Sequence, residues 1–283
     1  MKAKLARTVA SLVVMLSSGA VAFSSSGKPQ FTISIKDLPA ALAPLQVLIK
    51  THLLTAAKMW TEVIESKPCS IEIVFSIRDV VEGDSKKLGY GKSNVAATFG
   101  DERINGKFVS EQGLASELRT GHDPNNKEPD VEICFQSAYV MSEFWWDPDP
   151  TARKEVVPPR KLDALSVILH EFGHALAFNG WIDPKSGNLA GSHMSTYDRY
   201  VLWDGHDFFF QGPAATKIYG KPILLARSLN NYHHLGDKRS DIPTDSVLQN
   251  DLMTGYNFQW GKRYSVTLLD IAILKDCGIQ TRK

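Results

Sequence analysis

The stretch DALSVILHEFGHALAFNGW, residues 163–181, is the part of the sequence that decides the fold. Its apolar residues recur with the spacing of a helix that is buried on most of its surface. Asp163 is expected to cap the start of this helix and Gly180 to follow its end. Two histidines and a glutamate lie among the apolar residues, and burying such groups without partners is costly. The segment therefore predicts a helix with a function beyond packing.

The polar residues of this helix have the spacing of a metal site. His170 and His174 are four residues apart, so their imidazoles project from the same side of the helix and could hold one ion. Glu171 is offset by one position, so its carboxylate is expected beside the ion. This H-E-x-x-H pattern is typical of zinc hydrolases, in which the glutamate takes a proton from water on the metal. We therefore expect one Zn²⁺ ion and a glutamate general base.

A third protein ligand must come from elsewhere, because a catalytic zinc site usually has three protein ligands and one open position. No glutamate follows Glu171 in the sequence, so a downstream glutamate is excluded. Asp198 could bind zinc through oxygen, or could accept a hydrogen bond from a ligand histidine. A loop aspartate that bonds nearby backbone amides is the structural alternative. The other candidates are histidines remote in sequence: His193, His206, His233 and His234.

The overall composition excludes several classes of partner. With 32 Lys and Arg against 31 Asp and Glu, the formal net charge is +1, and no long basic block occurs. We therefore expect no binding to nucleic acid or to anionic membranes. The three cysteines lack C-x-x-C spacing, so metal binding through sulfur is not expected, although an exported protein could join two of them.

The N-terminal residues have the features of a signal peptide. Lys2, Lys4 and Arg7 precede a short apolar run that ends in Ala20-Val21-Ala22, a small-x-small cleavage pattern. We expect cleavage after Ala22 and a secreted or periplasmic protein. No later segment approaches about 18 uninterrupted apolar residues, so no membrane span is expected in the mature form.

The remaining sequence indicates an α+β domain. Helices are expected at residues 44–64 and 265–278, the second with Ser265 as its cap. Short strands are expected at residues 31–35, 70–77, 94–99 and 131–135. Four prolines make residues 143–161 a loop. We predict a single catalytic domain at residues 23–283, with an N-terminal lobe at 23–180 and a C-terminal lobe at 181–283.

Four segments together resemble a known family. They are VPPRKLDALSVILHEFGHALAFNGW (157–181), STYDRYVLWDG (195–205), YHHLGD (232–237) and NDLMTGYNFQWGKRYSVTLLDIAILKDCGI (250–279). Their order is similar to that of exported bacterial zinc metalloproteases of the metzincin clan, with distant similarity to the leishmanolysin branch. The resemblance covers roughly residues 131–279 and lies in the combination of motifs.

The resemblance implies a role for each matching residue. It implies that His170, His174 and His234 bind zinc and that Glu171 is the general base. His233 is then a neighbour of the site, and it stays the alternative third ligand. The resemblance also implies that Met253 forms an apolar floor beneath the metal, and that Tyr256 could donate a hydrogen bond in the transition state. The implied fold is zincin-like, with a twisted mixed β-sheet, an active-site helix and an irregular C-terminal lobe with a terminal helix.

The expected function is a secreted zinc endopeptidase that binds a protein or peptide substrate in a cleft between the two lobes. An extended peptide would add to the edge of the sheet by main-chain hydrogen bonds. The alternatives are a zinc-containing binding or adhesion module without turnover, and a zinc hydrolase of a non-peptide amide. Calcium is possible but not indicated, because no D-x-D-x-D-G loop joins the downstream aspartates Asp204, Asp207, Asp237, Asp241 and Asp245.

Overall fold

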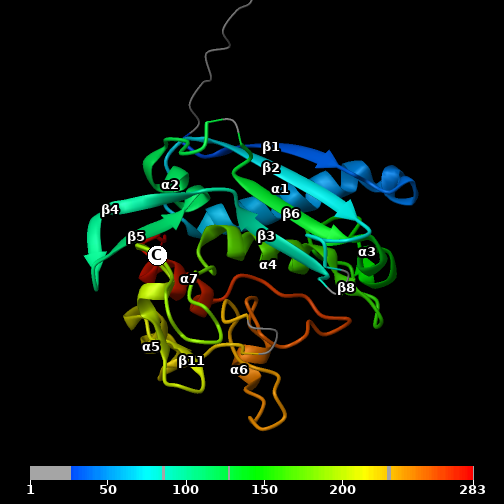
Figure 1. The fold of residues 1–283 in the computed structure, drawn as a ribbon. Coiled ribbons are helices and arrows are strands. Elements are labelled where there is room, and N and C mark those ends of the chain that lie inside the picture. The colour runs from blue at the N-terminus through cyan, green and yellow to red at the C-terminus, as the bar shows by residue number, and fades with distance from the viewer. Residues whose placement is uncertain (1–26, 85–86, 127, 228–230, 283) are drawn as a thin grey trace, which may run out of the picture.

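The computed structural model describes residues 27–84, 87–126, 128–227 and 231–282. The expected signal peptide, residues 1–22, lies outside them. A sheet backed by two helices forms the upper part of the molecule, and short helices, short strands and long loops form the lower part (Figure 1). The predicted α+β class is therefore confirmed.

The main sheet has the strand order β1-β2-β6-β3. The first three strands run parallel, and β3 runs antiparallel to β6 at one edge. The helices α1 (Gln46–Val63) and α4 (Ala164–Leu176) pack against each other below this sheet (Figure 1). The strands are β1 (Gln30–Lys36), β2 (Ser70–Arg78), β3 (Gly89–Ser93) and β6 (Val131–Gln136).

Edge strand β3 was not expected from the sequence, because its GYGKS segment is polar and rich in glycine. The glycines are required by close packing. A Cβ atom at Gly91 would lie 2.0 Å from the carbonyl oxygen of Glu171, and one at Gly89 would lie 2.4 Å from the ring of Phe135. Only glycine allows β3 to lie directly on α4 and on its neighbour β6.

The other elements are short and connect the sheet to the lower part. The hairpin of β4 and β5 pairs with β9, and β10, β11 and β12 form a small sheet. The strands are β4 (Ala96–Ile104), β5 (Lys107–Gln112), β7 (Phe144–Trp145), β8 (Leu162–Asp163), β9 (His193–Ser195), β10 (Val201–Trp203), β11 (Phe208–Phe210) and β12 (Ile223–Leu224). The helices are η1 (Ala40–Leu45), α2 (Gly113–Thr120), α3 (Ser137–Glu143), η2 (Asp198–Tyr200), α5 (Pro213–Tyr219), α6 (Ser246–Gln249) and α7 (Leu268–Asp276).

Two predicted helix ends differ from the structure. Helix α4 ends at Leu176, four residues before Gly180, because the N–H groups of Ala177 and Phe178 both bond to the Gly173 carbonyl and the chain turns away. Helix α7 is capped by Thr267 and not by Ser265, since Thr267 and Asp270 form a capping box. The predicted helix at 44–64 and the strand at 31–35 are confirmed by α1 and β1.

Within the described residues, the stretch Ala40–Val63 has the length and hydropathy of a membrane-spanning helix, with a mean hydropathy of 1.3. In this fold one face of the stretch packs in the protein core. Trp60 is buried and its indole Nε1 donates a hydrogen bond of 2.8 Å to the carbonyl of Leu169 in α4. Cys69, Cys134 and Cys277 are free thiols.

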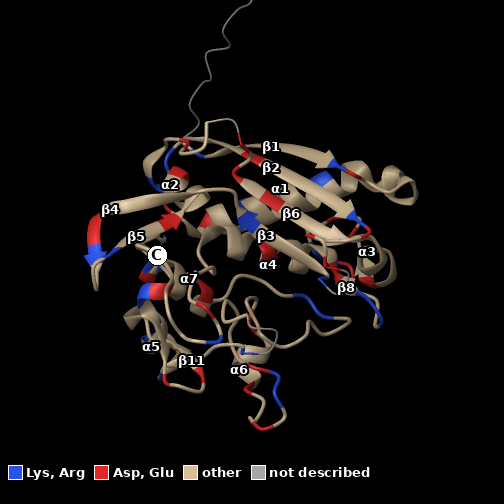
Figure 2. Ribbon diagram, viewed as in Figure 1, with Lys and Arg blue, Asp and Glu red and all other residues tan. Residues whose placement is uncertain are grey.

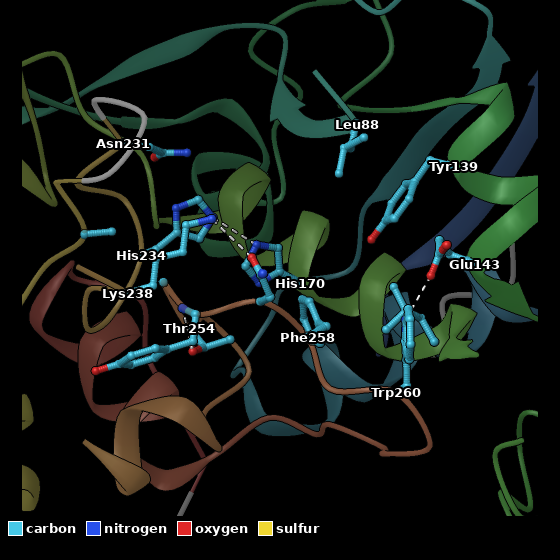
Figure 3. A pocket seen from close by; sticks show the side chains of 15 residues that line it. Leu88, Tyr139, Glu143, His170, Asn231, His234, Lys238, Thr254, Phe258 and Trp260 are labelled. Carbon is cyan, nitrogen blue, oxygen red and sulfur yellow. Dashed lines mark hydrogen bonds between the residues drawn. The ribbon is translucent and has the colours of Figure 1, made fainter. Parts of the chain in front are cut away.

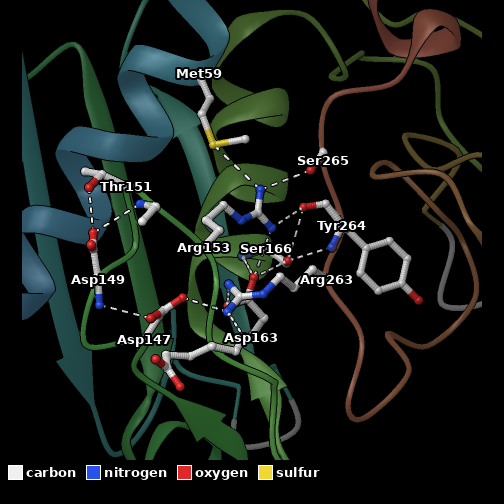
Figure 4. A network of polar contacts seen from close by, with 12 residues as sticks. Met59, Asp147, Asp149, Thr151, Arg153, Asp163, Ser166, Arg263, Tyr264 and Ser265 are labelled. Carbon is white, nitrogen blue, oxygen red and sulfur yellow. Dashed lines mark hydrogen bonds and ion pairs between the residues drawn. The ribbon is translucent and has the colours of Figure 1, made fainter.

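A buried polar network fixes the start of α4 (Figure 4). Asp163 caps the helix by accepting hydrogen bonds from the N–H and the hydroxyl of Ser166. The same carboxylate pairs with Arg153 and Arg263, each at 3.3 Å. Arg263 also pairs with buried Asp147 at 2.7 Å. The network therefore joins the proline-rich loop and the C-terminal segment to the helix that carries the histidines.

Candidate metal centre

Helix α4 and one remote loop bring three histidines together. His170 and His174 project from α4, and His234 comes from the chain between β12 and α6 (Figure 3). The Nε2 atoms of the three rings lie 3.1 Å from one another in every pair. Imidazole nitrogens at this separation, on segments 60 residues apart, form a site that could hold one metal ion.

The other side of each ring is held by the backbone. His170 Nδ1 lies 2.8 Å from the Leu252 carbonyl oxygen, and His174 Nδ1 lies 2.7 Å from that of Phe178. His234 has a hydrogen bond with the backbone of Asn231. A carbonyl oxygen only accepts, so Nδ1 of His170 and His174 carries the proton and Nε2 keeps its lone pair for a ligand. These bonds orient the rings toward one point.

Burial keeps the three imidazoles neutral. It lowers the pKa of His170 to about 3 and that of His174 to about 4, and it lowers the pKa of His234 strongly as well. The neighbouring rings add to this effect at His170 and His234, because a second positive charge in the cluster would be repelled. At neutral pH the rings therefore carry no proton that a metal would have to displace.

Met253 lies against α4 between the two helical histidines. A Cβ atom at Gly173 would meet the Met253 Sδ atom at 2.4 Å, so only glycine at this position leaves room for the thioether. The residue before it, Leu252, supplies the carbonyl that holds His170. The residue after His234, Leu235, donates its N–H to the Met253 carbonyl at 2.8 Å. This turn therefore couples the remote ligand to the helix.

Glu171 lies beside the histidines and against edge strand β3. The Gly91 N–H donates a hydrogen bond to its carboxylate, which lowers its pKa, as does the charge of Lys87. Burial is the larger effect and raises the pKa of Glu171 to about 8. Burial therefore favours the protonated form of this carboxyl group when no metal is bound, and the Gly91 N–H favours the ionised form.

Two cavities meet at the histidines. The larger one, of about 440 Å³, reaches His170 and His234 and is lined largely by apolar and aromatic side chains (Figure 3). The smaller one, of about 280 Å³, reaches Glu171 and His174 and is bordered by β3. His234 and Asn231 line both. The side chains that make the larger cavity apolar include Leu88, Tyr139, Leu162, Phe258 and Trp260.

Three other residues singled out from the sequence lie near the triad but contact other groups. The Nε2 atom of His233 accepts a hydrogen bond from the Gly180 N–H at 3.1 Å, so the ring faces the end of α4. Asp198 is buried and accepts hydrogen bonds from the N–H groups of Trp181 and Ser195 and from the Tyr232 hydroxyl. It thus holds the chain segments on both sides of the site together, and does not bond to a ligand histidine.

The third such residue, Tyr256, also lines the larger cavity. Its hydroxyl accepts a hydrogen bond of 3.1 Å from the Asp245 N–H. The structure therefore does not bring this hydroxyl to the histidines; it lies at the start of α6, where Asp245 is the N-cap.

The sequence analysis did not single out Tyr139, whose hydroxyl points into the larger cavity toward His170 (Figure 3). Burial, followed by the charge of Glu171, raises the pKa of Tyr139, so the hydroxyl keeps its proton. No hydrogen bond of this hydroxyl to another described residue is present. Tyr139 lies on α3, and no sequence pattern links that short helix to the H-E-x-x-H motif.

No protein-family model, curated protein sequence or solved structure matches the chain. The argument for function therefore rests on the geometry of the site.

Proposed function

We propose that the chain is a zinc-dependent endopeptidase whose ion is bound by His170, His174 and His234. The donor set supports zinc, because three neutral imidazoles suit zinc and leave one open position, whereas calcium and magnesium prefer oxygen ligands. Tetrahedral zinc with metal–nitrogen distances of about 2.0–2.1 Å separates its ligand atoms by about 3.3 Å. The observed nitrogen separations of 3.1 Å are close to this value.

The proposed chemistry is hydrolysis of an amide bond. Zinc bound by these ligands would supply a Lewis acid for the scissile carbonyl and would lower the pKa of water. Glu171 is the proposed general base: a carboxylate oxygen accepts the proton of the attacking water and passes it to the nitrogen of the leaving amine. The Gly91 N–H keeps this carboxylate in place beside His170 and His174.

The proposed substrate is an extended peptide. Strand β3 forms the edge of the main sheet and borders the cavity that contains Glu171. An edge strand offers unpaired main-chain groups, to which a peptide can add as a further strand. The apolar cavity on the other side of the histidines would accept a large apolar side chain next to the cleaved bond, beside Leu88 and Phe258. The Tyr139 hydroxyl is free to donate to a substrate carbonyl there.

Export is part of this proposal, because residues 1–22 have the pattern of a signal peptide. An exported peptidase would meet its substrates outside the cytoplasm.

The observation that carries the proposal is that the imidazoles of His170, His174 and His234 point toward one another, with the buried carboxylate of the next residue in the helix, Glu171, beside them. The test is Glu171→Gln, with Glu65→Gln as the matched control, because Glu65 is an exposed carboxylate two residues after the end of α1. We expect Glu171→Gln to keep its zinc and to lose casein hydrolysis, and Glu65→Gln to keep both. Casein hydrolysis by Glu171→Gln at the parental rate would refute the assigned base. Zinc binding by a parent protein that cleaves no peptide in a library would refute the peptidase and favour a binding module or a non-peptide amidase.

A further inference from the structure

A second cluster of metal-ligating groups lies at the other end of the main sheet. Glu117 lies on α2, Asp130 directly precedes β6, and Asp123 lies in the loop between them. One carboxylate oxygen from each residue lies within 4.8 Å of those of the other two. Figure 1 shows α2 beside the ends at which β2 and β6 begin. None of the three residues lines the two cavities beside the histidines.

Two of these carboxylates are buried with unpaired oxygens. Glu117 and Asp130 are only 2% and 1% exposed, yet Glu117 Oε2 and Asp130 Oδ1 have no hydrogen-bond partner. The second oxygen of Asp130 accepts the Glu72 N–H at 2.8 Å, so this side chain is fixed in its orientation. Buried carboxylate oxygens are normally paired, because leaving them without hydrogen bonds or counter-charge is costly. Among the described residues their compensation is a proton shared between Glu117 and Asp130, which then hydrogen-bond each other, and a bound cation could take the place of that proton.

No protein cation serves as that partner in the described part of the chain: none of its lysines, arginines or histidines lies within 4.0 Å of the three carboxylates. Burial, and then the neighbouring Asp130, raises the pKa of Glu117 to about 9. Asp123 and Glu72 raise it further, since they also carry negative charge. Without a cation, Glu117 is therefore held in its protonated form beside ionised neighbours.

The loop that carries Asp123 is already ordered around its side chain. Asp123 Oδ1 accepts the N–H groups of Asn125 and Asn126 at 2.7 and 2.9 Å. The side-chain oxygen of Asn125 is also buried and without a partner. The Asp123 side chain is therefore held in a fixed turn next to the other two carboxylates.

We propose that Glu117, Asp123 and Asp130 bind a Ca²⁺ ion that joins α2 to the start of β6. The donors are all oxygens, which suits calcium and not zinc. Ligands on opposite sides of a calcium ion lie up to about 5 Å apart, since each bond is about 2.3–2.6 Å long. The three oxygens lie within 4.8 Å of one another, so one calcium ion could contact all of them.

The direct test is calorimetric titration of the purified protein with CaCl₂ after dialysis against a chelating resin. We expect one site with a Kd of about 10⁻⁴–10⁻³ M, as in extracellular calcium sites, and weaker binding of MgCl₂. Asp123→Asn should weaken calcium binding at least about tenfold, since a charged ligand is lost. This residue is exposed, so the variant should fold. Glu128→Gln, an exposed carboxylate of the same loop outside the cluster, is the matched control and should bind as the parent does.

A second readout separates an ion site from a purely structural cluster. Without calcium, Glu117→Gln should melt close to the parental temperature, because the raised pKa keeps Glu117 protonated and the amide resembles that neutral carboxyl group. With calcium, the parent should gain melting temperature and Glu117→Gln should not. The upper expected Kd is about 10⁻³ M. If the parent binds no calcium at a CaCl₂ concentration about five times that value, the proposal is overturned. Equal calcium affinities of the parent and Asp123→Asn would also overturn it.

Discussion

Replacing Gly91 by alanine tests how closely β3 must approach α4. The added Cβ atom would lie 2.0 Å from the Glu171 carbonyl oxygen and 2.6 Å from the Glu171 Cβ atom. Non-bonded carbon atoms prefer about 3.5–4.0 Å, so β3 and α4 would have to separate by on the order of 1 Å. The atoms in conflict belong to the backbone of the helix, and they cannot avoid the methyl group by rotating a side chain.

Two effects of this separation can be given a magnitude. Overpacking of a tightly packed contact typically costs about 1–3 kcal/mol, so the free energy of unfolding should fall by that amount. The N–H that holds the Glu171 carboxylate moves away as well. Displacing a reacting group by about 1 Å can cost about 10²-fold in rate, so kcat/KM should fall by that order. Zinc content should not change, because Leu252, Phe178 and Asn231 hold the three histidines and β3 does not.

The assay is urea unfolding together with hydrolysis of a fluorogenic peptide and zinc analysis of the same preparation. Gly27→Ala is the matched control, because its Cβ atom would meet nothing within 4 Å. The control should equal the parent in all three measurements. If Gly91→Ala retains the parental stability and kcat/KM, the close packing of β3 on α4 and its role in positioning Glu171 are both refuted.

Three further predictions concern the helix start, the larger cavity and pH. Asp163→Ala should lower the free energy of unfolding in urea by about 3–5 kcal/mol, because two arginines lose their buried partner; a loss below about 1 kcal/mol, the usual value for an exposed pair, would contradict this. Tyr139→Phe should lower kcat by about 10- to 100-fold, because the hydroxyl that points toward His170 can no longer donate a hydrogen bond to the charged transition state. The free energy of unfolding should not change. An unaltered kcat would exclude a hydrogen bond from Tyr139 to the substrate. Burial lowers the pKa of His174 from 6.5 to about 4 in the folded, metal-free protein. As the pH falls below 6.5, the unfolded chain therefore binds a proton at His174, whereas the folded protein does so only near pH 4. The free energy of unfolding of the metal-free parent, minus that of metal-free His174→Ala, should therefore fall by about 1.4 kcal/mol per pH unit from pH 6.5 toward 4. If this difference does not change with pH, the His174 ring is not buried in its neutral form.

The helix that carries the site could be predicted from the sequence because its signals are local. Its apolar spacing, the Asp163 cap and the four-residue interval between His170 and His174 all act within one segment. The position of His234 depends on pairing between Leu235 and the turn at Met253, which no local pattern encodes. Without the family resemblance, the sequence left several candidates for the third metal ligand. Only the resemblance favoured His234, which is the residue that the structure brings to the site.

The parts of the site that the sequence did not reveal depend on contacts between distant segments. β3 has the composition of a loop, and it forms a strand because Gly89 and Gly91 allow it to pack on β6 and α4. The early end of α4 has a similar cause, since the Phe178 carbonyl turns back to hold His174. The cluster of Glu117, Asp123 and Asp130 could not be predicted, because its carboxylates come from a helix, a loop and the residue before a strand. They therefore form no motif of closely spaced aspartates in the sequence.

The measurement that tests the account most directly is the zinc content of the parent, His234→Ala and His233→Ala after dialysis at neutral pH. The parent should hold about one zinc ion per chain. His234→Ala should lose most of it, because the Nε2 atom that lies 3.1 Å from those of both helical histidines is removed. His233→Ala should keep it, because that ring bonds to the Gly180 N–H. A His234→Ala protein that retains as much zinc as the parent would contradict the three-histidine site.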